Sequence, residues 1–533
     1  MASVDQEKAP ARDSTTQHEE IVKDEHLGHL VTHEDHETSK WQAIKQNPTC
    51  FLWCLYAVWT ILLVTFENQA AGNVLGIPRF RQDFGYLHEG DYVIPGNWQS
   101  AFSGAPLATN VVGCFASAAI ADKIGRRFTI MLALVLSFVS ITLEVVATTN
   151  QMFFGGKFLN GFAIGTFQTV STAYLGEIVP TPLRGIMTCL NAMAYTIGPF
   201  TVALIVNSTG QMESRWAYRA VFVSQYAFAA VAAAGSIWMP ESPWWLVSQD
   251  RHEQAVKSLQ RLGHKNGEEH KRLANIRVTL QEIRRETDGV TYMECFRKSN
   301  LRRTIVSLSP LTIQQLTGIV FAASYSTYYA QLAGYSVGMS FKLQITQQVL
   351  SIVGNMMSWD LIDRFGRRPL TIYGLVGLTT ILWVMGGLAV GGSPAMLRGT
   401  VAMILVYCWL YNVTIGATSW TVVTETATAR LRPKTVAIGN VSNSLVSIVW
   451  QFTMPYMFNP DQGNLGGKVG FIFGGLSFVC IGYLWWYMPE TKGRTYEELD
   501  EMFMKKVPAR KFGTYKTEVE EKGVQAQQSE AQT

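Results

Sequence analysis

ADKIGRR, at residues 121 to 127, occurs a second time in nearly the same form as IDRFGRR, at residues 362 to 368. Two further motifs repeat in the same order: LGEIVPTPLRG (175 to 185) returns as VTETATARLRP (423 to 433), and MPESPWW (239 to 245) returns as MPETKGR (488 to 494). The offsets between the copies are 241, 248 and 249 residues. Three repeats at nearly one offset predict that the chain consists of two homologous halves.

The composition is typical of a membrane protein. Of the 533 residues, 48% are hydrophobic and only 16% are charged, which is poor in charge for a soluble enzyme. A search for apolar stretches of about 20 residues finds twelve, centred near residues 60, 109, 137, 163, 196, 229, 316, 352, 379, 411, 445 and 478. We therefore expect an all-α membrane protein with twelve transmembrane helices in two pseudo-symmetric six-helix halves.

The same pattern divides the chain and predicts its orientation. The expected parts are a disordered cytosolic N-terminal tail (1–48), the first half (49–245), cytosolic linker helices (246–304), the second half (305–490) and a cytosolic C-terminal tail (491–533). The loops rich in Lys and Arg follow even-numbered spans, and such loops stay in the cytoplasm. Both termini are therefore expected there, and the sequon at Asn207 is expected to be glycosylated on the outer side.

Several classes of function find no support. The net charge of +4 is too small to indicate a nucleic-acid partner. The seven cysteines include no CxxC pair, so neither a metal site nor a disulfide framework is expected. Outside the spans we find no nucleophile–base constellation, phosphate loop or metal-ligand set. The chain is not expected to be an enzyme or to use a cofactor.

Taken together, the repeated motifs resemble those of the sugar porter family of the major facilitator superfamily. Besides the loops quoted above, PESPWWL (240 to 246) and PETKGRTYEELDEMF (489 to 503) carry the resemblance, which covers about residues 50 to 505. IQQLTGI (313 to 319) and YSTYYAQLAG (325 to 334) are most similar to the fungal maltose and α-glucoside permeases. The resemblance implies the major facilitator fold, in which the two halves rock about a central cavity at the bilayer midplane.

The resemblance also implies a proton-coupling pair. VTFENQAAG (64 to 72) places Glu67 in span 1, where proton-coupled members have an aromatic residue followed by an acid, and GKFLNGFAIG (156 to 165) places Lys157 in span 4. The family usually has Asp and Arg at these positions. A charge at mid-span costs roughly 3 kcal/mol or more, so we expect the two to face each other and the proton gradient to supply the energy. The alternative is that Glu67 belongs to a static polar seam.

The candidate substrate ligands are polar or aromatic residues of several spans: Gln314, Gln315, Trp420, Asn443, Asn191 and Tyr325. The first half departs from the hexose porters, because Ala192 and Pro199 stand where glutamines are usual, and Val320 stands where span 7 often has Asn. Tyr195 offers a compensating polar group. A less crowded pocket suits a disaccharide, and it equally suits a solute that is not a sugar.

Acidic and basic residues recur at the inner ends of the spans, and the resemblance implies that they act as gates. They are Asp122, Arg126, Arg127, Glu177, Arg184 and Glu241 in the first half, and Asp363, Arg367, Arg368, Glu425, Arg432 and Glu490 in the second. Such pairs form and separate at a cost of about 1 kcal/mol each at partly exposed sites. The alternative is that the basic residues only fix the topology.

The sequence therefore predicts a monomeric, proton-coupled importer of α-glucosides such as maltose in the plasma membrane. Its partners would be a small sugar, the proton and the lipid bilayer. Two alternatives stay open: the same machinery carrying a hexose or a non-sugar solute such as a secondary metabolite, and a nutrient sensor that transports nothing.

Overall fold

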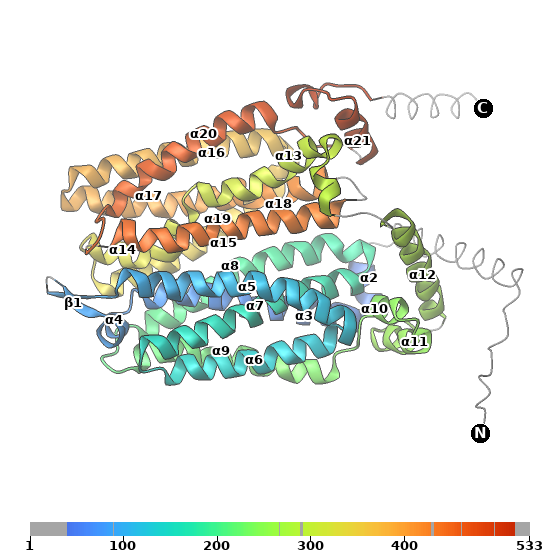
Figure 1. Cartoon of the computed structure of the whole chain (residues 1–533), viewed down its shortest axis with the longest axis horizontal. Coiled ribbons are helices and arrows are strands. Elements are labelled where there is room, and N and C mark those ends of the chain that lie inside the picture. Colours follow the sequence, from blue (N-terminus) through green and yellow to red (C-terminus); the bar gives the residue numbers. More distant parts are fainter. Residues whose placement is uncertain are drawn as a thin grey trace, which may run out of the picture.

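Two bundles of long helices lie side by side (Figure 1). The computed structural model describes residues 40–88, 90–265, 267–287, 292–427, 431–459, 461–494 and 496–517. The first bundle consists of α3 (Pro48–Val74), α5 (Gly96–Ile124), α6 (Arg126–Val146), α7 (Asn150–Ile178), α8 (Arg184–Thr209) and α9 (Trp216–Trp238). The second consists of α13 (Lys298–Leu316), η3 (Phe321–Tyr325), α14 (Ser326–Leu332), α15 (Val337–Phe365), α16 (Arg367–Gly391), α17 (Pro394–Val413), α18 (Ile415–Thr426), α19 (Arg432–Phe458) and α20 (Val469–Tyr487).

Nine helical segments of the described chain are long and apolar enough to cross a membrane, which makes this a multi-pass membrane protein. Three further helices, α7, α15 and α19, lie between these segments in the sequence and have 29, 29 and 27 residues. These three helices have the length of a span but carry more polar residues. Nine segments and three helices match the twelve predicted spans in position, while the membrane crossing of the three polar helices stays a prediction.

The two ends of the bundle differ, and we name them by what they carry. The hairpin end carries α4 (Pro78–Phe84) and the antiparallel strands β1 (Tyr86–His88) and β2 (Asp91–Val93). The linker end carries α10 (Pro243–Ser248), α11 (His252–Arg261), α12 (Glu268–Thr287) and α21 (Tyr496–Met504) (Figure 1).

The boundaries of the expected parts need two corrections. Residues 1–39 of the predicted tail lie outside the described residues, but α2 (Lys40–Gln46) is helical, so the prediction of disorder is wrong for this segment. The reason is that α2 buries Ala43 against the first bundle. At the other boundary, α13 already begins at Lys298, within the predicted linker. The C-terminal segment contains α21, whose Met502 is fully buried with Phe512.

Helices α5 and α7 cross each other at close range inside the first half. A Cβ atom added at Gly161 would lie only 2.1 Å from Thr109 Oγ1, and one added at Gly113 would lie 2.5 Å from the carbonyl oxygen of Phe162. Small residues at such crossings let helix backbones pack directly in a membrane. This packing holds the polar residues of α7 inside the bundle.

The hydrogen bonds that join the two halves gather at the hairpin end. Gln331 of α14 donates to the carbonyl oxygen of Gly76 at 2.6 Å and accepts from Arg81 Nη2 at 2.9 Å. Ser100 of α5 donates to the carbonyl oxygen of Phe452 in α19 at 2.9 Å. The halves are therefore closed against each other at this end.

Candidate functional site

The structure brings Glu67 of α3 and Lys157 of α7 together inside the first half. Lys157 Nζ donates to Glu67 Oε1, and the two side chains are 0% and 4% exposed. The lone charges that the sequence places in spans 1 and 4 therefore form an ion pair. Because each charge would be costly alone in the membrane interior, the contact explains how both are tolerated.

A second carboxylate, which the sequence analysis missed, belongs to the same cluster. Glu144 of α6 is fully buried, and its Oε2 lies 3.3 Å from Lys157 Nζ. Asn160 Nδ2 donates to Glu144 Oε1 at 3.1 Å, and Gln225 Nε2 of α9 donates to Glu67 Oε2. We call these five residues the charged cluster. An acid in the otherwise apolar stretch SITLEVV (140 to 146) was the signal that could have revealed it.

Aromatic rings close the charged cluster on the side of the hairpin end. Lys157 Nζ lies 4.6 Å from the ring centroid of Phe222 and 5.5 Å from that of Phe153. Phe153 in turn packs edge to face against Phe80 of α4, with centroids 5.3 Å apart. Rings that face a cation stabilise it, and this layer separates the cluster from the hairpin end.

In the second half, three of the predicted substrate ligands are engaged with the protein. Gln314 Nε2 donates to the carbonyl oxygens of Ile415 and Gly416, each at 3.1 Å, so it supports the break between α17 and α18. Gln315 Nε2 donates to Asn443 Oδ1 at 3.2 Å. The structure thus brings Gln315 and Asn443 together, and their binding of a substrate stays a prediction.

The other predicted ligands lie in different surroundings. Trp420 of α18 is 46% exposed, whereas Tyr325 is fully buried, with its ring centroid 5.8 Å from that of Phe458. Asn191 of α8 is half-buried. These positions allow Trp420 to meet a solute directly and place Tyr325 in the core of the second half.

Polar side chains of the first half form a further group that the sequence analysis named only in part. Asn110 Nδ2 of α5 donates to Gln168 Oε1 of α7, and Gln168 Nε2 donates to the hydroxyl of Tyr195 of α8, both at 3.4 Å. Tyr195 is 42% exposed. The group therefore joins α5, α7 and α8 through polar contacts, with Tyr195 partly exposed.

At the linker end, one carboxylate holds the start of α6. Glu241 accepts from the backbone N–H groups of Arg126 at 2.8 Å and Arg127 at 3.2 Å, where a negative charge stabilises the helix. Arg126 Nη2 donates to Glu177 Oε1 at 2.9 Å, and its Nη1 lies 3.3 Å from Asp122. Burial raises the pKa of Glu241 above its ordinary value.

The second half repeats this arrangement at the start of α16. Glu490 accepts from the backbone N–H groups of Arg367 at 3.0 Å and Arg368 at 3.1 Å. Arg367 Nη2 lies 2.8 Å from Glu425 Oε1, and its Nη1 lies 3.3 Å from Asp363. The matching contacts confirm the repeat.

These linker-end pairs connect helices within one half. Both loops turn at a glycine with positive φ, 94° at Gly125 and 91° at Gly366, where any other residue would be strained. The side chains of Arg184 and Arg432 lie outside the described part of the structure. Asn207 lies in the last turn of α8, towards the hairpin end. Gating and glycosylation stay predictions.

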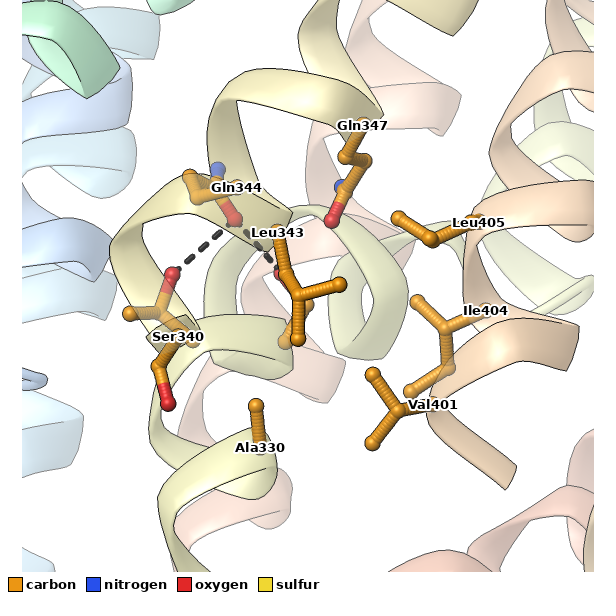
Figure 2. Close-up of a pocket in the computed structure, with 10 residues that line it drawn as sticks. Ala330, Ser340, Leu343, Gln344, Gln347, Val401, Ile404 and Leu405 are labelled. Atoms are coloured by element: carbon orange, nitrogen blue, oxygen red, sulfur yellow. Dashed lines mark hydrogen bonds between the residues drawn. The ribbon is translucent and has the colours of Figure 1, made fainter. Parts of the chain in front are cut away.

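A small pocket lies between α14, α15 and α17 in the second half (Figure 2). Part of its polar lining is bonded within the protein: Gln344 Oε1 accepts from the hydroxyls of Ser326 and Thr327, each at 2.9 Å. Gln347 Nε2 donates to the carbonyl oxygen of Ala322 at 2.9 Å. These contacts tie α15 to α14 and to the π-helical turn η3, and so hold span 7 where it departs from a regular α-helix.

Comparisons with known proteins agree with this architecture. The general alpha-glucoside permease of Saccharomyces cerevisiae is 30% identical over 482 residues, which is 89% of this chain and 78% of the permease. A maltose permease of the same species is 29% identical over 486 residues, 89% of this chain and 79% of that protein.

Solved structures show the same fold. The inward open conformation of the xylose transporter XylE from E. coli matches with a TM-score of 0.69 at 20% identity, over 85% of this chain and 99% of that one. The proton:xylose symporter XylE bound to 6-bromo-6-deoxy-D-glucose matches with a TM-score of 0.66 at 21% identity, over 86% of this chain and 100% of that one. The expected major facilitator fold is thereby confirmed.

The model of the family described as "Sugar (and other) transporter" matches residues 53–503. This range spans both halves and includes the charged cluster and the linker-end motifs. The chain therefore belongs to the sugar (and other) transporter family.

Proposed function

We propose that this transporter is a proton-coupled importer of α-glucosides such as maltose, which works by alternating access in the plasma membrane. The observation that carries the proposal is the buried ion pair of Glu67 and Lys157. A carboxylate in the interior of a membrane bundle is expensive and is usually kept for proton or ion transfer. The amides and tyrosine of the central helices would bind the sugar.

The coupling follows from electrostatics. While Glu67 pairs with Lys157 it stays ionised, and when the helices shift it takes a proton from outside. Each proton that then enters down an inside-negative potential supplies about 2.3 kcal/mol per 100 mV. We place the linker end in the cytoplasm, because the Lys- and Arg-rich loops lie at that end of the bundle. The hairpin end then faces the outside, so a structure closed at the hairpin end is closed to the outside.

The substrate class rests on the relatives and on the polar lining. The relatives reported above are α-glucoside and maltose permeases. Gln315 with Asn443 in one half, and Gln168 with Tyr195 in the other, offer the hydrogen-bonding groups that sugar hydroxyls need. A second candidate is another solute on the same machinery, which Ala192 and Pro199 favour because they remove two amides usual in hexose porters.

Uptake by cells without other sugar transporters tests the proposal. Labelled maltose and, in parallel, labelled glucose would be offered at pH 5 and pH 7.5, with and without a protonophore. We expect maltose to accumulate at pH 5 and the accumulation to collapse with the protonophore. If the protein reaches the membrane and neither sugar enters, the α-glucoside assignment is wrong and the second candidate stands.

A further inference from the structure

The charged cluster contains one more carboxylate than its single cation can balance. Lys157 contacts both Glu67 and Glu144, and the three side chains are 0%, 4% and 0% exposed. With every group ionised, the cluster would hold a net charge of −1 inside the membrane. A buried unpaired charge is avoided by taking up a proton, so the cluster needs one proton to be neutral.

We infer that Glu144 is a second proton acceptor of the coupling site, and that Glu67 and Glu144 share one proton across Lys157. The inference deepens the proposed function and rests on it for its role in transport. With the proton on Glu144, Lys157 balances ionised Glu67; with the proton on Glu67, it balances ionised Glu144. The cluster is neutral in both states, which a simple pair of Glu67 and Lys157 could not be after protonation.

Lys157 Nζ donates to Glu67 and lies 3.3 Å from Glu144 Oε2, so it stands between the two carboxylates and could pass a proton from one to the other. Lys157 gives an N–H proton to Glu67, forming a carboxylic O–H bond, and then takes the proton from the O–H group of Glu144, which becomes a carboxylate. One proton has moved from Glu144 to Glu67, and Lys157 is an ammonium group again. Arg effectively never loses its proton, whereas Lys can, so Lys157 is the residue type that such a transfer requires.

The surroundings of Glu144 leave this exchange undisturbed. Besides Glu144 itself, the ionisable groups of the charged cluster are Lys157 and Glu67. The neutral amides of Asn160 and Gln225 each donate to one carboxylate. Glu144 is also packed tightly, because a Cβ atom added at Gly156 would lie 2.8 Å from its Cγ. The side chain is thereby held against α7.

Infrared spectroscopy of the purified full-length protein in liposomes tests the inference without any transported solute. The wild type at pH 7 should show the carbonyl band of one buried protonated carboxylic acid. Glu144→Gln and Glu67→Gln should each lose that band, because the remaining carboxylate pairs with Lys157. Glu144→Asp and the half-exposed control Glu268→Gln should keep it.

Absence of the band from the wild type, or its persistence in Glu144→Gln, would overturn the inference. If Glu144→Gln does not fold, Glu67→Gln decides by the same criterion. In transport, Glu144→Gln and Lys157→Arg should each lower the accumulation ratio of a coupled solute at least about tenfold, the effect of one pKa unit. An unchanged ratio in both variants would also contradict the relay, whereas failure of maltose uptake by the wild type would bear only on the proposed function.

Discussion

Lys157 Nζ lies 3.3 Å from Glu144 Oε2, and neither side chain is exposed. The contact joins α6 to α7, while the bond from Lys157 to Glu67 joins α7 to α3. One lysine thus connects three helices of the first half through buried ion pairs. Lys157 therefore has a structural role in addition to the proton-coupling role that we propose for it.

Removing the charge of Lys157 should destabilise the protein. Lys157→Met leaves both carboxylates without a cation, and breaking a buried ion pair from one side costs about 3–5 kcal/mol. Thermal unfolding in detergent measures the loss. The control is the triple variant with Glu67→Gln and Glu144→Gln, which has no buried charge at the cluster and should recover most of the stability. A single variant as stable as the wild type would contradict the account.

Weakening the contact between the halves should favour opening at the hairpin end. Gln331→Ala removes two hydrogen bonds between the halves, each worth about 1 kcal/mol, so the open population should rise by more than tenfold. The probe is a cysteine introduced at the buried Thr327, which packs near Gly76, and its labelling by an impermeant maleimide. Gln151→Ala, an exposed residue of α7, is the control. Equal labelling in both variants would show that this contact does not hold the end closed.

The close crossing of α5 and α7 should not tolerate a methyl group. Gly161→Ala would bring a Cβ atom to 2.1 Å from Thr109 Oγ1, whereas Gly155→Ala, earlier in the same helix, meets nothing within 4 Å. Overpacking costs about 1–3 kcal/mol, so Gly161→Ala should lower the unfolding temperature. Gly155→Ala should leave it unchanged or raise it slightly. Similar behaviour of the two variants would refute the crossing geometry.

The packing of the linker helices around the buried His264, between α11 and α12, should weaken in acid. Burial, reinforced by Arg272, lowers the pKa of His264 to about 3. Its neutral form therefore stabilises the folded state above pH 6.5, and this contribution is lost as the pH falls from about 6.5 towards 3. At pH 5 the loss amounts to about 2 kcal/mol.

Chemical denaturation of wild type and His264→Gln between pH 7.5 and pH 5 measures this slope. The variant should lose less stability than the wild type over that range. Parallel pH profiles would mean that His264 is protonated in the folded state without cost.

Much of the architecture could be predicted because the same motifs occur in both halves of the sequence. The turns at Gly125 and Gly366 and the carboxylates Glu241 and Glu490 recur in order, and lone charges in apolar runs pointed to Glu67 and Lys157. Glu144 was missed because an acid near the end of a span is easily taken for an interfacial residue. Its inward direction depends on the packing of α6 against Gly156, which sequence spacing does not reveal.

The predicted ligands show a similar limit. The sequence predicts one role for the adjacent residues Gln314 and Gln315, but successive residues of a helix point in different directions. Gln314 supports the break after α17, whereas Gln315 meets Asn443. Which amide faces a solute depends on the kink of span 7 at η3, a feature of the tertiary structure.

We propose that Glu67 carries the proton that drives sugar entry, and a measurement of proton flux into liposomes tests this role. Protein in liposomes with an internal pH indicator would receive maltose outside, with no pH gradient at the start. The wild type should acidify the interior, whereas Glu67→Gln should not, although it should still exchange labelled for unlabelled maltose. Acidification by Glu67→Gln at the wild-type rate would contradict the claim.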